Sequence, residues 1–231
     1  MNRRMANTIQ TIIVFRSLIF IYSQPKQLQH LINSGKELDS NLRSVLVKTK
    51  DILLVGCTVA LQYSDLMNLQ KANLQYNNQQ YYLKVQSKKT KTYTQIKLPL
   101  YAIEIFRKYS KKGNRLLPYF NLVRLNLYLK ELAEHLGWTD EVVKTRQKRG
   151  KAIVVYKDAR QKTHYRFCDL ISSHIMRRTA ITTMLRLQMP EHLVRKISGH
   201  APNSVEFHKY VSIAQNYLDV ETDKVFARLG G

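Results

Sequence analysis

Four reactive side chains stand close together near the C-terminal end of the sequence. His174 and Arg177 are three residues apart, so they share one face if this stretch is helical. His200 directly follows Gly199, and Tyr210 comes ten residues after that histidine. An arginine fork binds phosphate oxygens, a histidine binds or moves a proton, and a tyrosine can attack as a nucleophile. The spacing therefore allows one site at which these groups act together on a phosphate.

Each of these side chains also has an ordinary structural interpretation. By itself, His174 is consistent with a helix cap, Arg177 with a surface arginine, and His200 with a loop histidine bonded to the backbone. Tyr210 is one of 14 tyrosines and carries little information alone. Single short motifs produce many false matches. The argument for a site therefore depends on the spacing of the whole set.

The charge of the chain fits a polyanionic partner. The 231 residues suit one sizeable domain, and 44% of them are hydrophobic, which is enough for a packed core. Lys and Arg number 38 against 16 Asp and Glu, a formal net charge of +22. Such a field favours nucleic acid as the partner, with an acidic membrane surface or a merely solvated basic protein as alternatives.

The sequence predicts neither a metal site nor a membrane segment. Cys57 and Cys168 lack the spacing of metal ligands, so we expect two core thiols in a reducing compartment. The apolar run near the N-terminus is interrupted by Arg16, and no small-residue cleavage site follows, which argues against a signal peptide. No stretch is long and apolar enough to cross a bilayer.

Hydrophobic periodicity predicts a mostly α protein with a small β-hairpin, an α+β fold. Residues 81–85 and 94–98 alternate between apolar and polar side chains and predict the two strands of the hairpin. Helices are predicted over residues 39–60, 102–109, 121–136, 175–187, 204–211 and from 216 or 219 to 229, with a further helix opened by Pro190.

Two segments are unusually rich in cations. The hairpin turn at residues 87–92 carries several lysines, and residues 144–166 contain nine Lys or Arg with one acid, Asp158. The second segment predicts a basic hairpin or loop around a strand at residues 152–156. Each segment either lies on a nucleic-acid backbone or is simply solvated.

The helices on either side of residues 188–190 are similar to a helix-turn-helix, which would place the second helix in a DNA groove. However, Leu193, Val194 and Ile197 predict that this second helix packs against the core. A helix-turn-helix regulator also leaves the four reactive side chains unexplained, and it stands as an alternative only.

Three boxes in the same part of the chain resemble those of the tyrosine recombinases, the phage integrase family. Residues 173–180 (SHIMRRTA) resemble the H-x-x-R box of that family. Residues 197–200 (ISGH) resemble its L-G-H motif, and residues 209–211 (KYV) resemble its nucleophile motif.

Two upstream features extend the resemblance. Residues 59–66 are similar to the family's T-G-L-R-x-S-E-L motif, and Lys91 lies on a hairpin similar to the one that carries the family's catalytic lysine. The resemblance spans about residues 24–229 in the family's order. Its style, with S-D-L, a basic insertion and I-S-G-H, is closest to integrases of Bacteroidetes mobile elements.

The resemblance implies a catalytic domain that is a helical bundle with a small antiparallel β-hairpin sheet, and site-specific DNA recombination or integration as its function. Tyr210 would attack a DNA phosphodiester and form a 3′-phosphotyrosyl bond, without metal or nucleotide cofactor, because the bond energy is kept in the covalent link. Arg177 and His200 would stabilise charge on the phosphoryl oxygens. His174 would bind phosphate and move the nucleophile's proton, and Lys91 would protonate the leaving 5′ oxygen.

The resemblance also implies double-stranded DNA as the partner. Four subunits would act together on two duplexes at recombination or attachment sites, in the cytoplasm of a bacterium and at its nucleoid, with no membrane involved. Lys89 would replace Lys91 if the register of the turn differs. Contacts to DNA are expected from Lys88, Lys89, Arg178, Lys148, Arg149 and Lys151.

One position departs from the family's catalytic pattern. The family's first arginine falls on Gln62, whereas the following Asp65 is retained. A neutral amide cannot replace a fixed positive charge, and losing such a contact costs about 10²-fold or more in rate. The expected outcomes are an inactive protein, a weakened one, or one in which another cation, such as Lys71 or Arg43, supplies the charge instead. An impaired or inactive DNA-binding remnant is therefore one alternative function, and a type IB topoisomerase-like nicking and closing activity is another.

The resemblance divides the chain into two parts. Residues 1–23 are expected to be the remnant of an upstream core-binding region or a linker, and residues 24–231 the catalytic domain. The tail after residue 213 is expected to dock either on its own subunit or on a neighbour.

Overall fold

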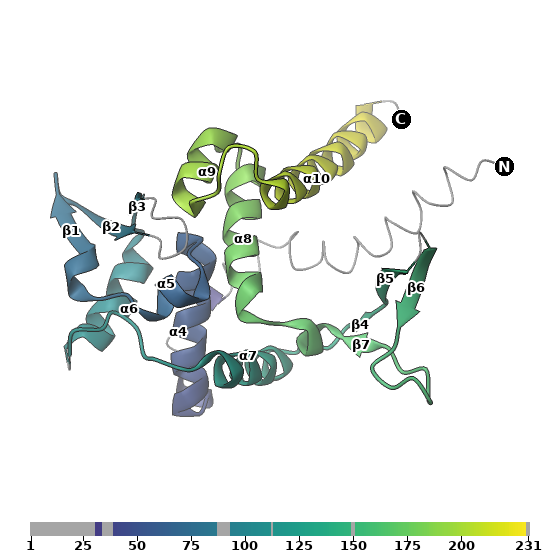
Figure 1. Cartoon of the computed structure of the whole chain (residues 1–231), viewed down its shortest axis with the longest axis horizontal. Coiled ribbons are helices and arrows are strands. Elements are labelled where there is room, and N and C mark those ends of the chain that lie inside the picture. The colour runs from purple at the N-terminus through teal and green to yellow at the C-terminus, as the bar shows by residue number, and fades with distance from the viewer. Residues whose placement is uncertain (1–30, 34–38, 87–92, 112, 149–150, 230–231) are drawn as a thin grey trace.

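The computed structural model describes residues 31–33, 39–86, 93–111, 113–148 and 151–229 (Figure 1). The helices are α4 (Ser44–Val59), α5 (Tyr63–Met67), α6 (Leu100–Ser110), α7 (Leu122–His135), α8 (Ser173–Arg186), α9 (Glu191–Ser198) and α10 (Val205–Leu229), with short 3-10 helices η1 (Lys71–Asn73) and η2 (Phe167–Leu170). The strands are β1 (Leu74–Asn77), β2 (Gln80–Gln86), β3 (Tyr93–Lys97), β4 (Glu141–Val142), β5 (Lys144–Lys148), β6 (Lys151–Val155) and β7 (Tyr165–Arg166). The predicted mostly α fold with small antiparallel sheets is confirmed.

Helix α4 is central to the fold. All of its residues from 49 to 57 are buried, and a helix that is buried on every side needs neighbours on every side. Helices α6, α7 and α8 pack against it. Its buried charges are paired, because Asp51 lies 3.8 Å from Lys50 Nζ and 2.8 Å from Lys108 Nζ on α6. The almost wholly apolar run at residues 51–60 is buried except at Thr58, which is partly exposed.

Helices α4 and α8 pack closely against each other at Gly56. A Cβ atom at this position would lie 2.6 Å from Met176 Sδ and 2.9 Å from Met176 Cβ. Such distances are far inside van der Waals contact, so only glycine allows this packing. The close approach brings the C-terminal end of α4 against the face of α8 that carries Arg177.

The end of α4 turns through a left-handed residue. Ala60 has φ 54° and ψ 20°, a conformation that usually requires glycine. The chain is then extended at Gln62, and α5 begins at Tyr63. The Ala60 carbonyl is thereby turned away from the axis of α4 and is free to accept a hydrogen bond from elsewhere in the fold.

The predicted β-hairpin is confirmed and is part of a three-stranded antiparallel sheet. Strand β2 lies between β1 and β3, and Leu83 faces Ile96 across the β2–β3 pair. Both of these side chains are buried. Strand β3 also contacts α9, where Thr94 Oγ1 donates to the Lys196 carbonyl at 3.4 Å. The turn at residues 87–92 lies outside the described residues.

Helix α7 and the basic hairpin also follow the prediction. Asn121 caps α7 by accepting from the Arg124 backbone N–H at 2.9 Å, and the stripe of Leu125, Leu129 and Leu132 is buried. Strands β5 and β6 form an antiparallel pair that stands out from the helices at one end of the molecule (Figure 1). The short β4–β7 pair between this hairpin and the helices was not predicted.

Four predicted helices differ from those observed. The helix expected over residues 39–60 is interrupted, because residues 42 and 43 are not helical and α4 begins at Ser44. On α9, Leu193 is 42% exposed, although Val194 is buried as predicted. The two helices expected after residue 204 form one helix, α10, because residues 205–229 contain neither Gly nor Pro to end it.

None of the helices in the described part of the chain combines the length and apolar character that crossing a bilayer requires.

The contact at Gly56 predicts an effect on stability. We expect Gly56→Val to lower the free energy of unfolding by about 1–3 kcal/mol, because the added methyl groups push α4 and α8 apart. The measurement is urea denaturation at pH 7. Gly113→Val is the control, because nothing lies within 4 Å of a Cβ atom there, and a change within about 0.5 kcal/mol is expected. Equal effects of the two substitutions would contradict the packing argument.

Candidate active site

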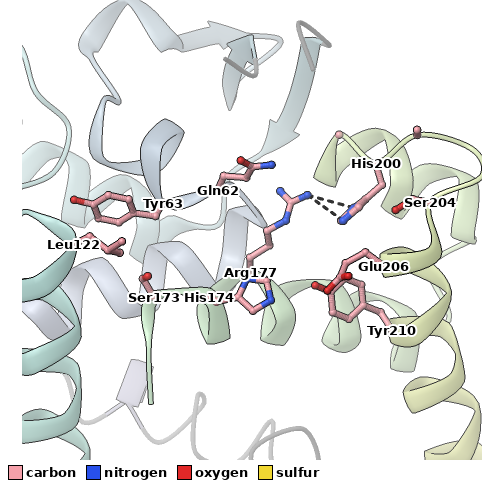
Figure 2. Close-up of a pocket in the computed structure, with 12 residues that line it drawn as sticks. Gln62, Tyr63, Leu122, Ser173, His174, Arg177, His200, Ser204, Glu206 and Tyr210 are labelled. Atoms are coloured by element: carbon pink, nitrogen blue, oxygen red, sulfur yellow. Dashed lines mark hydrogen bonds between the residues drawn. The ribbon is translucent and has the colours of Figure 1, made fainter. Parts of the chain in front are cut away.

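A cavity of about 630 Å³ lies where α5, the start of α8, the end of α9 and the start of α10 meet (Figure 2). Four of the residues singled out from the sequence line it together with the departing position Gln62. The lining residues are Gln62, Tyr63, Leu122, Ser173, His174, Arg177, Gly199, His200, Ala201, Ser204, Glu206 and Tyr210. The structure therefore brings together side chains that are up to about 150 positions apart in the sequence.

Arg177 is the most deeply embedded charged group of this cavity, with 8% of the residue exposed. Its Nη1 donates to the Ala60 carbonyl at 2.8 Å, and its Nη2 donates to the Ser198 carbonyl at 2.7 Å. These two carbonyls belong to the ends of α4 and α9. Burial lowers the pKa of Arg177, but a guanidinium remains charged in proteins. One side chain of α8 thus holds two other helix ends in place.

His200 is positioned by the turn that ends α9. Gly199 has φ 67° and ψ 31°, and the His200 backbone N–H donates to the Arg195 carbonyl at 3.1 Å. The ring Nδ1 lies 2.8 Å from Ser198 Oγ, and the ring Nε2 lies 3.2 Å from Arg177 Nη2. Since Ser198 Oγ already donates to the Val194 carbonyl at 2.7 Å, we assign the ring proton to Nδ1 and the acceptor role to Nε2.

The protonation of the two histidines follows from their surroundings. Burial, followed by the positive charge of Arg177, lowers the pKa of His200 to about 4. Partial burial, followed by the charge of Arg178, lowers the pKa of His174. Glu206 opposes both changes. Both imidazoles are therefore neutral at pH 7, so each has one nitrogen that can accept a proton or a hydrogen bond.

Tyr210 is buried in α10, with 2% of the residue exposed. Its ring packs edge-on against His200 and Phe207, with centroids 5.9 and 6.5 Å apart. Within the part of the chain that the structure describes, its hydroxyl has no hydrogen-bond partner. Burial raises its pKa, although Arg178 and Arg177 act in the opposite direction. A buried hydroxyl without a partner costs about 1–3 kcal/mol, which calls for a functional explanation.

Gln62 forms the wall of the cavity opposite Tyr210 (Figure 2). Its carbonyl accepts from the backbone N–H groups of Asp65 and Leu66, which fixes the start of α5. Asp65 is buried nearby and raises the pKa of Arg177. The amide side chain thus stands where the sequence comparison expected a cation.

Neither cation suggested as a replacement for that charge lines the cavity. Arg43 precedes α4 and pairs with Glu131 on α7, whereas Gln62 follows the other end of α4, about 24 Å away along the helix axis. Lys71 is exposed in η1 and its backbone is bonded to the Asn114 carbonyl. In this structure neither Lys71 nor Arg43 is therefore placed to supply the charge beside Gln62.

The other residues singled out from the sequence lie elsewhere. Arg178 is half-buried on α8 next to Arg177. Lys148 and Lys151 face each other at the end of the β5–β6 hairpin, and they are not part of the cavity. Lys88, Lys89, Lys91 and Arg149 lie outside the described residues.

Sequence reasoning missed Glu206, which lines the cavity from the first turn of α10. The available signal was its spacing of four residues before Tyr210, which places both side chains on one face of a helix. The sequence predicts a helix over this stretch, but an acidic residue in a first helical turn is ordinarily explained by the helix dipole. No group of three or more metal-ligating side chains occurs within the described ranges.

Comparisons with known proteins fit this geometry. The profile of the phage integrase family matches residues 23–217. The fold is similar to that of XerH site-specific recombinase bound to a palindromic difH substrate in a post-cleavage complex, with a TM-score of 0.59, 11% identity, and coverage of 90% of this chain and 53% of that chain. No curated protein sequence matches the chain.

Two further solved structures share the fold. XerA recombinase gives a TM-score of 0.54 at 14% identity, with 86% of this chain and 64% of that chain covered. The Tn1549 transposon integrase (residues 82–397), in complex with circular intermediate DNA, gives a TM-score of 0.50 at 14% identity, with 81% and 59% covered. The chain thus spans between 53% and 64% of the length of these three proteins.

The lowered pKa of His200 predicts a pH dependence of stability. Between pH 6.5 and pH 4 the unfolded chain binds a proton at this residue and the folded chain does not, so stability is lost as the pH falls through this window. We expect a loss on the order of 1–3 kcal/mol from this residue. NMR titration of the imidazole, with urea denaturation at pH 7 and pH 5, measures both effects.

The variant His200→Asn serves as the control, because it should show a smaller loss of stability between pH 7 and pH 5. A folded-state imidazole that titrates near pH 6.5 would contradict the structural argument.

Proposed function

Because this chain belongs to the phage integrase family, we propose that it cleaves and rejoins double-stranded DNA by transesterification through Tyr210. The observation that carries the proposal is the buried hydroxyl of Tyr210, which has no hydrogen-bond partner among the described residues and shares a cavity with Arg177 and two neutral histidines. A tyrosine without a structural hydrogen bond, beside a fixed guanidinium, suits an attack on a phosphate ester.

The proposed step conserves one phosphodiester bond. Tyr210 Oη forms a bond to phosphorus, the bond from phosphorus to the 5′ oxygen breaks, and a 3′-phosphotyrosyl link with a free 5′-hydroxyl results. The tyrosine proton passes to His174, which is neutral at pH 7 and can accept it. The leaving 5′ oxygen takes a proton from Lys91. A 5′-hydroxyl from a second strand then reverses the step, and no cofactor enters the balance.

Arg177 is proposed to stabilise the charge that develops on the phosphoryl oxygens. His200 is proposed to assist as a donor once the substrate is bound, with its ring proton on Nε2 and the phosphate oxygen in place of its contact with Arg177. A guanidinium has five N–H donors. In Arg177 two of these are directed to the Ala60 and Ser198 carbonyls, and a third to His200 Nε2. Two donors remain for a phosphate oxygen. Because the backbone contacts hold the guanidinium rigidly, little reorganisation is needed when the substrate binds.

The basic hairpin is proposed to hold the duplex outside the cavity. Lys148 and Lys151 are cross-strand neighbours at the end of β5–β6, a place from which both can reach a DNA backbone. Arg178, beside the cavity, and Lys88, Lys89 and Arg149 are proposed to make further phosphate contacts. These contacts would position the duplex without reading its sequence.

We further propose that residues 24–231 act as the catalytic domain and that four subunits exchange strands between two duplexes. The likeness to integrases of Bacteroidetes mobile elements stands as part of this proposal. An activity limited to nicking and closing would use the same residues, and only the pairing of two recombination sites distinguishes the two functions.

The first test is covalent capture. A DNA duplex with a nick close to the cleavage site loses a short fragment after attack, so the covalent adduct accumulates and is seen on a denaturing gel. We expect an adduct with the wild-type chain and none with Tyr210→Phe. An adduct that persists in Tyr210→Phe would show that the nucleophile lies elsewhere, and no adduct under any condition, including in Gln62→Arg, would favour an inactive DNA-binding remnant.

The second test concerns the missing cation. We expect Gln62→Arg to raise the rate of adduct formation about 10-fold or more, because it adds a guanidinium to the wall opposite Tyr210. The control is Gln75→Arg, which adds the same charge at an exposed position of β1 outside the cavity. A similar gain in both variants would mean that general attraction to DNA, and not the cavity, explains the effect.

A further inference from the structure

The cavity contains a carboxylate that the proposed reaction does not use. Glu206 lies in the first turn of α10, four residues before Tyr210, and Figure 2 shows its carboxylate beside the tyrosine ring. Residues four apart on a helix share a face. Both side chains therefore reach the cavity from the same side, opposite Gln62.

The charge of Glu206 is only weakly compensated. Its carboxylate lies 3.4 Å from Lys209 Nζ, and the two side chains are 54% and 64% exposed. Exposed pairs of this kind stabilise little and are screened by salt. Lys209 itself does not line the cavity. The carboxylate thus contributes a negative field to the space between Arg177, His174 and Tyr210.

The charges that line the cavity balance one another. Among its described lining residues, only Arg177 and Glu206 are charged at pH 7, because His174 and His200 are neutral. The whole chain, in contrast, has a formal charge of +22. Arg178 lies beside the cavity and lowers the pKa of Tyr210, whereas Glu206 raises it. The carboxylate therefore cancels part of the positive charge that the two arginines present to a phosphodiester anion.

We propose that Glu206 is an anionic brake on this site, a specificity-determining residue whose carboxylate repels the scissile phosphate and opposes ionisation of Tyr210. The inference rests on the proposed function. The repulsion makes the site selective, because a phosphate enters the cavity only when other contacts along the duplex offset the repulsion. Together with the neutral Gln62 on the opposite wall, the carboxylate makes cleavage depend on extended DNA binding.

A purely structural role for Glu206 makes a different prediction. An acidic residue in the first turn of a helix stabilises it through the helix dipole. If that were its only role, removing the charge would lower the stability of α10 and leave phosphate binding and the cleavage rate unchanged or reduced. The two roles are therefore separable by measurement.

The test compares Glu206→Gln, which removes the charge at nearly constant shape, with Glu206→Asp, which keeps it. Asp219→Asn is the matched control, because it removes an exposed carboxylate from the same helix outside the cavity. One readout is the affinity for inorganic phosphate, followed through the imidazole NMR signals of His174 and His200. The other is the rate of covalent adduct formation with the nicked duplex, in the wild-type and Gln62→Arg backgrounds.

We expect Glu206→Gln to bind phosphate about 3- to 10-fold more tightly and to form the adduct faster by a similar factor, the size of one screened charge contact. Glu206→Asp keeps the charge on a shorter side chain and should lie between Glu206→Gln and the wild type, whereas Asp219→Asn should remain within about twofold of the wild type. A slower reaction in Glu206→Gln would identify a proton acceptor or positioning residue instead of a brake, and an unchanged phosphate affinity would leave only the helix-dipole role. Either result overturns the proposal.

The phosphate titration does not require catalysis, so it tests the brake even if no variant forms an adduct. In that case the proposed function fails, and the inference about Glu206 stands or falls on phosphate affinity alone.

Discussion

The fork of hydrogen bonds from Arg177 to the Ala60 and Ser198 carbonyls is the contact on which the site depends. A guanidinium this deeply buried requires acceptors, and carbonyls at helix ends are among the few backbone groups without a partner in their own helix. The ends of α4 and α9 provide these acceptor carbonyls. The close packing of α4 and α8 at Gly56 brings Arg177 within reach of the Ala60 carbonyl. The same interaction therefore satisfies a structural need and aims a cation into the cavity.

Much of the fold could be predicted from local patterns. The stripe on α7, the alternation in β2 and β3 and the glycine that ends α9 each follow from a few neighbouring residues. What could not be predicted depends on contacts between distant parts of the chain. Ala60 is left-handed because Arg177 and the following α5 require it, and Leu193 is exposed because α9 buries only a narrow stripe.

In the candidate site, too, some residues could be predicted from local patterns and others could not. The spacing of His174, Arg177, His200 and Tyr210 predicted a common cavity, because two of them share a helix face and the others follow short turns. Glu206 was missed because an acidic residue in a helical first turn has a common structural explanation. Only the three-dimensional arrangement shows that Glu206 lines the same cavity as Tyr210. It was also needed to show that neither Lys71 nor Arg43 lines the cavity with Gln62.

Helix α10 is continuous from the turn that holds Tyr210 to Leu229. Tyr210 lies in the second turn of a helix of 25 residues, which at 1.5 Å per residue is a rod about 37 Å long. Beyond Ala214 the rod carries exposed apolar side chains such as Val225 and Phe226 and extends away from the other helices (Figure 1). The buried part of this helix, which includes Phe207, Tyr210 and Ala214, is packed against the core. Because Tyr210 is part of the same continuous helix, a tilt of the exposed end would also move the Tyr210 side chain.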